Sequence, residues 1–329
     1  MGVRRSARAP VRNGVADTAH GSAATHVVPT VANGPDSTGL AGNGESTPRS
    51  GARRGWQDSR VLLLPVLAFL GIFFLFPLWL VLKQSLFDPE LTLDNYREMI
   101  AVPAYGKVLL RTFRLAAIVT VISVVLGYPV AYFIAHASRR LAAFVLLAVL
   151  VPLWTSLLVR TYAWIVLLGR EGVINQWLRG TGISDRPADL LFNLFAVTIG
   201  MVHALLPFVI LPLVAVMRGV EPSLVPAARS LGAGAWDAFW RVFFPLTVPG
   251  LATGALLVFI LSLGFFVTPS VLGNTSEITI AMLIATQMQV TLDWGLGAAL
   301  AVLLLVLAAA VVYLYQRRYG LDRLLGGAP

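Results

Sequence analysis

The residues that could carry catalysis are few in this sequence of 329 residues. A nucleotide-binding P-loop needs a glycine, four further residues and then Gly-Lys-Ser/Thr, because its backbone amides surround the phosphates. The only Gly-Lys pair is Gly106-Lys107, which has Ala101 at the first glycine position and Val108 at the hydroxyl position. The chain also has no cysteine, no Gly-x-Ser-x-Gly motif and no His/Asp/Glu cluster with metal-ligand spacing. We therefore predict no catalytic site, no metal site and no cofactor, so that a partner must hydrolyse any ATP used.

A second set of residues could contact a transported solute. Arg160 lies inside a hydrophobic run, where a charge usually faces protein or water. It would oppose a dication and favour an anionic or zwitterionic solute, although it could equally snorkel to the headgroups. A cation would instead need carboxylates and aromatic faces, and four acids could serve, although solvated loops carry acids anyway: Glu171, Asp189, Glu277 and Asp293. His203 is more typical of a hydrogen bond between helices than of a proton relay. The predicted substrate path consists of Trp154, Arg160, Tyr162, Trp164, Glu277 and Asp293.

Composition places these residues in a membrane protein. Hydrophobic residues make up 57% of the chain and charged residues only 12%, with a mean hydropathy of +0.78. This leaves too little polar surface for a soluble protein of this length. A net charge of +9 would indicate nucleic acid in a soluble domain, but much of the arginine lies in tails and short loops, where it indicates topology. We predict an all-α, polytopic protein that contacts the lipid bilayer and no nucleic acid.

Six hydrophobic stretches are long enough to cross, or nearly cross, a hydrocarbon core of roughly 30 Å. They lie at about 61–82, 109–135, 141–168, 190–217, 251–267 and 295–315. The third could tilt or break near Pro152. Short basic segments after the second and sixth stretches place both termini in the cytoplasm by the positive-inside rule. Three regions follow: a disordered cytoplasmic tail (1–58), a six-span domain (59–318) and a C-terminal tail (319–329).

The segment 221–249, between the fourth and fifth stretches, has its own order. Helical spacing places Leu224, Ala227, Ala228 and Leu231 on one face, and Gly232 follows at the position of a left-handed C-cap. A second helix should begin near Ala235 and end at Pro245 and Pro249. Its spacing pairs Asp237 with Arg241 and gathers an aromatic face of Trp236, Phe239, Trp240, Phe243 and Phe244. The segment could dock a partner or lie on the bilayer surface, anchored by its tryptophans.

The spacing of Ala227, Ala228, Gly232 and the run 242–245 (Val-Phe-Phe-Pro) resembles the EAA loop of binding-protein-dependent ABC importer permeases. Pro226 stands where that family usually has glutamate. The resemblance implies that the segment faces the cytoplasm and that its helix sits in a groove of the ATPase subunit. It implies an ATPase-coupling role for Ala227, Ala228, Arg229, Gly232, Val242 and Pro245.

Further motifs resemble the spermidine/putrescine (PotB-like) permease subfamily over roughly residues 60–315. They are Pro152-Leu-Trp-Thr-Ser156, Arg160-Thr-Tyr-Ala-Trp164, Leu168-Gly-Arg-Glu-Gly172 and Gly264-Phe-Phe-Val-Thr-Pro269. The resemblance implies the MetI-like fold of a type I importer that works by alternating access. The implied partners are ABC ATPase subunits, a second permease subunit and an extracytoplasmic substrate-binding protein in the bacterial inner membrane.

Alternatives to a polyamine permease remain at this point. Relatives with these motifs serve other small solutes, including opines, thiamine and phosphonates. A stand-alone secondary transporter is a different class, and the absence of a visible internal repeat argues mildly against it. For a membrane enzyme or scaffold, the only support is the presence of polar residues within the hydrophobic stretches.

Overall fold

The computed structural model describes residues 55–87, 90–183 and 186–320. The chain divides into two units, residues 1–59 and 60–329, and the first is described only from Gly55. Most of the predicted disordered tail and of the C-terminal tail therefore lies outside the described residues.

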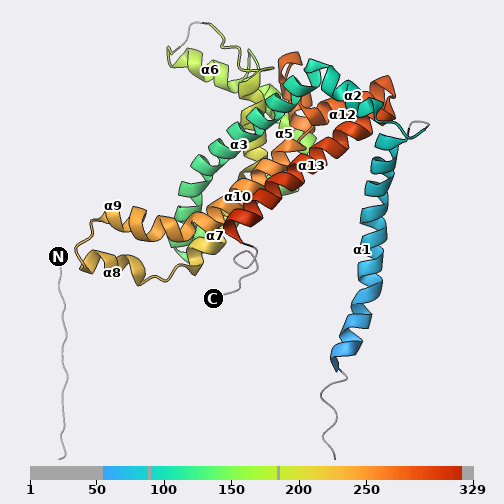
Figure 1. Ribbon diagram of the computed structural model, residues 1–329. Coiled ribbons are helices and arrows are strands. Elements are labelled where there is room, and N and C mark those ends of the chain that lie inside the picture. The colour runs from blue at the N-terminus through green and yellow to red at the C-terminus, as the bar shows by residue number, and fades with distance from the viewer. Residues whose placement is uncertain (1–54, 88–89, 184–185, 321–329) are drawn as a thin grey trace, which may run out of the picture. The chain divides into compact units, whose positions relative to one another are not determined.

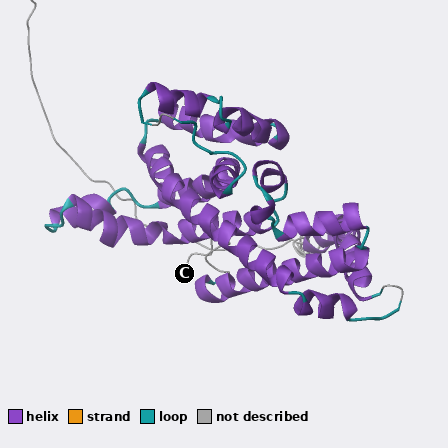
Figure 2. Cartoon of the chain, turned by 90° about the horizontal axis from the view of Figure 1, so that it is seen from above, coloured by secondary structure: helices purple, strands orange, loops and turns teal. Residues whose placement is uncertain are grey.

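The described residues are almost entirely helical, and no strand occurs among them (Figure 2). Five helices are long and apolar enough to cross a membrane. They are α1 (Gly55–Leu86), α3 (Pro103–His136), α7 (Leu194–Gly219), the continuous helix Ala235–Leu263 and α13 (Trp294–Tyr319). A sixth span results if α4 (Arg139–Trp154) and the segment Leu157–Gly180, which meet at a bend of 102°, count as one. The predicted all-α fold is confirmed, and its six spans are confirmed if the bent pair counts as one span. The break near Pro152 is also confirmed.

The helix Ala235–Leu263 combines three labelled parts: α9 (Ala235–Ala238), the π-helix η1 (Phe239–Phe243) and α10 (Phe244–Leu263). The segment Leu157–Gly180 combines α5 (Leu157–Leu168) and α6 (Val173–Gly180). The remaining short elements are α2 (Asp94–Ala101), α8 (Leu224–Ser230), α11 (Val267–Leu272), η2 (Thr275–Glu277), α12 (Ile280–Thr286) and η3 (Gln287–Thr291).

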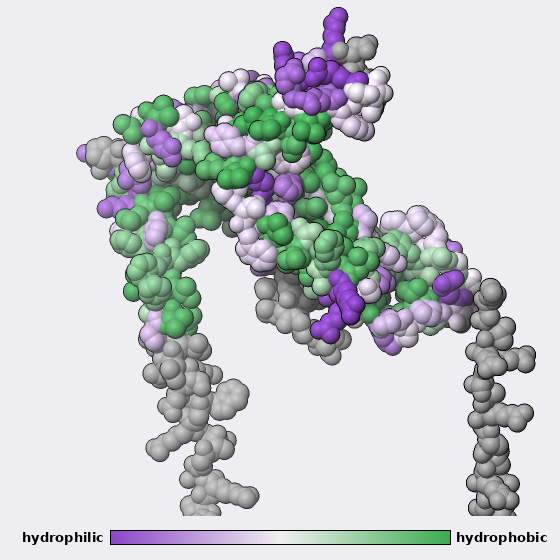
Figure 3. Space-filling view, turned by 180° about the vertical axis from the view of Figure 1, so that it is seen from behind, coloured by the Kyte–Doolittle hydropathy of each residue, from purple (hydrophilic) through white to green (hydrophobic). Residues whose placement is uncertain are grey.

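Helices α3, α7 and α10 pack against one another and hold most of the buried core (Figure 1). Lipid tails are as apolar as leucine, so close backbone approach and van der Waals contact stabilise such a bundle. Gly254 of α10 provides one such approach, because a Cβ there would lie 3.0 Å from the Cα of Val209 in α7. In contrast, none of the apolar window of α1 is buried inside the chain. Hydrophilic residues gather over α6, whereas the α8–α9 loop shows a mixture of hydrophobic and hydrophilic residues (Figure 3).

The prediction that Pro245 and Pro249 end the second helix of the 221–249 segment is wrong. Pro245 lies in the first turn of α10, and the helix continues through Pro249 to Leu263. In η1 the backbone N–H of Phe244 bonds the carbonyl of Phe239, five residues back. This wider turn directly precedes Pro245, which then occupies a helix-start position that tolerates a missing N–H. The helix of the fifth predicted stretch therefore begins much earlier than 251.

Candidate functional site

The loop between α7 and α10 has the two-helix form that its sequence predicts. Helix α8 ends at Ser230, and Gly232 then adopts a φ of +95°. The N–H groups of Gly232 and Ala233 bond the carbonyls of Arg229 and Ala228 at 3.0 and 3.1 Å, which closes the C-terminus of α8. Glycine is the residue for this left-handed geometry because it has no Cβ. The second helix begins at Ala235, so both the C-cap and the helix start are confirmed.

The two sides of α8 differ. One side carries Ala227, which is exposed, and leads to Leu231, whose side chain is 90% exposed. The other side carries Val225, Pro226 and Arg229, which line a cavity against the ends of α3 and α7. The structure thus separates Arg229 from Ala227 among the residues predicted to couple to an ATPase. Of the others in that set, Ala228 is half-buried, Gly232 is exposed in the turn, Val242 is half-buried in η1 and Pro245 is exposed.

The second helix of the loop is tied to α3 by aromatic contacts. The ring of Tyr132 lies 5.9 Å from that of Phe239 and 5.4 Å from that of Phe243. His136 lies 5.4 Å from Phe243, and the hydroxyls of Tyr128 and Thr247 are 3.0 Å apart. Movement of the loop must therefore displace the end of α3 or break these contacts.

The predicted aromatic face of this helix is divided between the core and the surface. Phe243 is only 4% exposed, whereas Trp236 is 73% and Trp240 43% exposed. On the polar side, the predicted pair of Asp237 and Arg241 forms an ion pair at 3.3 Å. The aromatic partners on α3, Tyr132 and His136, were not predicted. Their spacing at four-residue intervals from Tyr128 indicates that the three share a helix face, but it does not indicate what that face contacts.

Arg160, predicted on the substrate path, stabilises the break in the third span. Its Nη2 donates to the backbone carbonyls of Pro152 and of Thr155, the latter at 3.1 Å. The guanidinium group therefore supplies donors to carbonyls at the end of α4, where the carbonyl of Pro152 also accepts from the backbone N–H of Thr155 at 3.3 Å. Trp154, the last residue of α4, is 75% exposed and Tyr162 on α5 is 59% exposed, so both present aromatic surface beside the break.

After the break, polar side chains of α5 form hydrogen bonds to α7 and α11. The indole N–H of Trp164 donates to Nδ1 of His203 on α7 at 3.3 Å, which confirms His203 as a hydrogen-bonded residue between helices. The buried hydroxyls of Thr161 and of Thr268 on α11 are 3.4 Å apart. Sequence reasoning missed this threonine pair, because threonine is common in membrane helices and neither position stands out.

The acids proposed for a cation lie apart from this cluster. Glu277 lines a separate cavity of about 190 Å³ with Arg111 and Arg114. Asp293 is the N-cap of α13, and its Oδ1 accepts from the N–H of Leu296 at 2.9 Å. The other two acids form ion pairs, Glu171 with Arg179 at 3.3 Å and Asp189 with Arg170 at 2.9 Å. Each acid thus has a basic neighbour or a structural role.

The comparisons with known proteins agree with this architecture. Residues 123–320 match the family model of the binding-protein-dependent transport system inner membrane component. The spermidine/putrescine transport system permease protein PotB of Salmonella typhimurium is 32% identical over 265 residues, 78% of this chain and 92% of that protein. PotB of Escherichia coli is 35% identical over 226 residues, 69% of this chain and 82% of that protein.

Solved structures show the same fold. A bacterial alginate ABC transporter, crystallised in complex with an alginate pentasaccharide-bound periplasmic protein, contains a chain that matches with a TM-score of 0.62. The match covers 80% of this chain and 96% of that chain at 18% sequence identity. This multi-pass inner membrane protein therefore belongs to the binding-protein-dependent transport system inner membrane components, as an ABC importer permease of the PotB-like subfamily.

Proposed function

We propose that the chain is the permease subunit of an ATP-driven importer and forms the path of a small, polyamine-like solute by alternating access. The observation that carries the proposal is the α8–Gly232–α9 turn, whose Ala227–Leu231 side is exposed while its second helix packs on α3. Such a loop can receive movement on one side and pass it to the spans on the other. The ATP would be bound by a partner, since the sequence has no P-loop.

The proposed importer function also implies three kinds of partner. ABC ATPase subunits would contact the exposed side of α8 in the cytoplasm, where both termini of this chain would also lie. A second permease subunit would complete the path. A substrate-binding protein would dock outside, as the periplasmic protein does in the alginate transporter. The residues assigned to ATPase coupling are those of the loop motif. The residues assigned to the path are Trp154, Arg160, Tyr162 and Trp164 around the α4–α5 break, together with Glu277 and Asp293.

A polyamine is favoured as the solute by the two PotB relatives, whose names specify spermidine and putrescine. A second candidate, an anionic or zwitterionic solute carried by the same machine, is favoured by the arginines. Arg160 lies at the α4–α5 break, and Arg111 and Arg114 share a cavity with Glu277. Uptake of labelled spermidine, in competition with opines, thiamine and phosphonates, would separate these candidates.

The coupling role is tested by replacing Gly232 with valine. A β-branched residue is strained at a φ of +95°, so Gly232→Val should distort the turn. We expect substrate-stimulated ATPase activity of the reconstituted complex to fall about tenfold or more, while the variant still inserts and purifies with its partners.

Gly234 provides the matched control two residues away. Its φ of −64° suits any residue, and a Cβ there would meet only the carboxylate of Asp237 at 3.8 Å. Gly234→Val should therefore retain most of the stimulation. Full stimulation in Gly232→Val would show that the turn does not couple the spans to ATP hydrolysis.

A further inference from the structure

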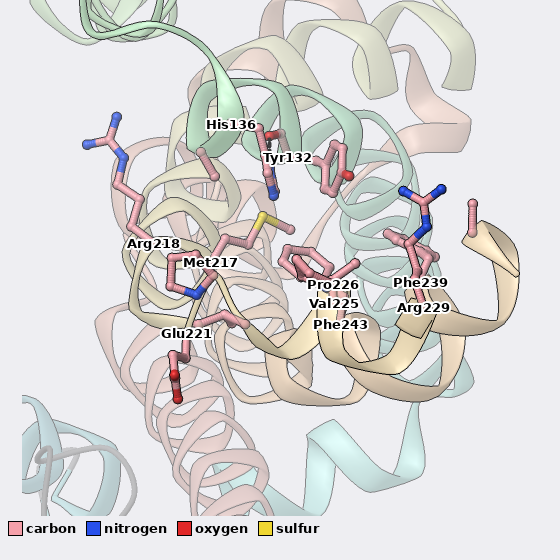
Figure 4. Close-up of a pocket in the computed structure, with 14 residues that line it drawn as sticks. Tyr132, His136, Met217, Arg218, Glu221, Val225, Pro226, Arg229, Phe239 and Phe243 are labelled. Atoms are coloured by element: carbon pink, nitrogen blue, oxygen red, sulfur yellow. Dashed lines mark hydrogen bonds between the residues drawn. The ribbon is translucent and has the colours of Figure 1, made fainter. Parts of the chain in front are cut away.

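A cavity of about 490 Å³ lies between the α8–α9 loop and the ends of α3 and α7 (Figure 4). Small-molecule sites in proteins are typically about 300–1,000 Å³, so this cavity is large enough for a ligand. It lies on the Pro226 and Arg229 side of α8. The exposed Ala227–Leu231 side, which the proposed function assigns to the ATPase, remains free when the cavity is filled.

The lining is apolar and aromatic in the centre and basic at two edges. Tyr132 and His136 from α3, which pack on Phe243, line the cavity together with Met217 and Pro226 (Figure 4). The side chains of Arg218 and Arg229 lie at opposite sides of this centre (Figure 4).

The basic charge at these edges is not balanced within the described residues. Neither Arg218 nor Arg229 forms an ion pair there, and Arg218 makes one long hydrogen bond, 3.4 Å, to the carbonyl of Ile134. Glu221 is the acid of the lining, and its carboxylate accepts a hydrogen bond from Ser223 and points away from the centre (Figure 4). The cavity is thus complementary to an anion that carries an apolar part.

The position of the cavity indicates the source of such an anion. The spans α3 and α7 end at His136 and Gly219, so the cavity lies at the level where the hydrocarbon core gives way to the headgroups. The exposed rings of Trp236 and Trp240 nearby are typical of that interface. Basic pockets between helix ends at this depth are suited to the headgroups of anionic lipids.

We infer that this cavity binds an anionic phospholipid, with its phosphate attracted to the basic edges that Arg218 and Arg229 form and its glycerol and first acyl carbons against the aromatic centre. The bound lipid would bridge α8 to the ends of α3 and α7 and so stiffen the loop. Binding itself does not depend on the proposed function, although an effect of the lipid on coupling would.

The test is native mass spectrometry of the purified complex with phosphatidylglycerol or phosphatidylcholine of the same acyl chains. We expect wild type to retain phosphatidylglycerol preferentially. An arginine near the membrane surface contributes about a fivefold preference for an anionic lipid. In the double variant Arg218→Gln/Arg229→Gln, the preference for phosphatidylglycerol over phosphatidylcholine should therefore fall roughly 25-fold. The double lysine variant should keep most of the preference, because the charge remains.

Arg241→Gln is the matched control, since Arg241 belongs to the same loop but pairs with Asp237 and lies outside the cavity lining. It should leave retention unchanged. Equal retention of both lipids by wild type, or equal loss in the control and the double variant, would overturn the assignment. Displacement of the lipid by soluble glycerol phosphate at similar concentration would also overturn it, in favour of a free phosphate site. Failure of the Gly232→Val test with intact lipid selectivity would reject the proposed function alone.

Discussion

Two places where proline meets a membrane helix have opposite outcomes in this chain. Shortly after Pro152 the third span breaks, at Thr155 and Ser156, and the helices on either side meet at 102°. At Pro245 the helix that leads into the fifth span continues for the rest of its length. The residue is the same, so the difference must come from what surrounds it.

The surroundings differ in how the backbone near each proline is hydrogen-bonded. Beside Pro152, Thr155 and Ser156 adopt extended ψ angles, and the guanidinium of Arg160 bonds the carbonyls of Pro152 and Thr155. Before Pro245, the π-turn η1 closes the backbone with its own wider bond. In this chain the broken span thus uses a side-chain donor at the helix end, whereas the continuous helix uses an extra residue in the turn.

The largest effect should come from removing the donor at the break. Arg160→Met leaves two carbonyls without their charged partner, and hydrogen bonds to charged groups contribute about 1.5–3 kcal/mol each. We expect a loss of roughly 3 kcal/mol of stability, measured by thermal unfolding in detergent. Arg160→Lys should restore part of this loss. Unchanged stability of Arg160→Met would mean that the break is stabilised by packing alone.

A smaller effect is expected at the continuous helix. Tyr128→Phe removes the hydroxyl that lies 3.0 Å from that of Thr247, two residues after Pro245. A single neutral hydrogen bond contributes about 1 kcal/mol, so stability should fall by about that amount in the same assay. A loss as large as that of Arg160→Met would show that the π-turn also depends on a side-chain donor.

The smallest effect should come from the surface pair that joins α9 to the π-turn. Asp237 and Arg241 are 53% and 81% exposed, and such pairs contribute about 0.3 kcal/mol. Asp237→Asn should therefore leave the unfolding temperature almost unchanged at moderate salt. A clear loss that disappears at 1 M salt would instead indicate that this pair helps to form η1.

The sequence predicted the break and the two-helix loop because both depend on local residues. Gly232 can adopt a positive φ that other residues avoid, and Pro152 lies in an overlong hydrophobic run. The continuity through Pro245 was not predictable from local rules, because it depends on one extra residue per turn in η1.

The candidate site was predicted less completely for a similar reason. The motif residues of the loop were identified by spacing, but the side of α8 that each occupies depends on how α8 packs on α3 and α7. Arg160 was selected as a membrane-depth charge, yet its partners are backbone carbonyls, which no side-chain pattern records. Asp293 differs from Arg160, since its N-cap bond to Leu296 depends on local residues alone, and its place on the substrate path stays a prediction.

The exposed side of α8 is proposed to dock on a partner ATPase in the cytoplasm. The chain has no cysteine, so Leu231→Cys, at a position 90% exposed, would introduce a single thiol for cross-linking in native membranes. Trp177→Cys on α6, at a position 62% exposed, is the control on the predicted outer side. We expect Leu231→Cys alone to cross-link to an ATPase subunit. Labelling of Leu231→Cys by an impermeant maleimide added outside intact cells, without any ATPase cross-link, would contradict the account.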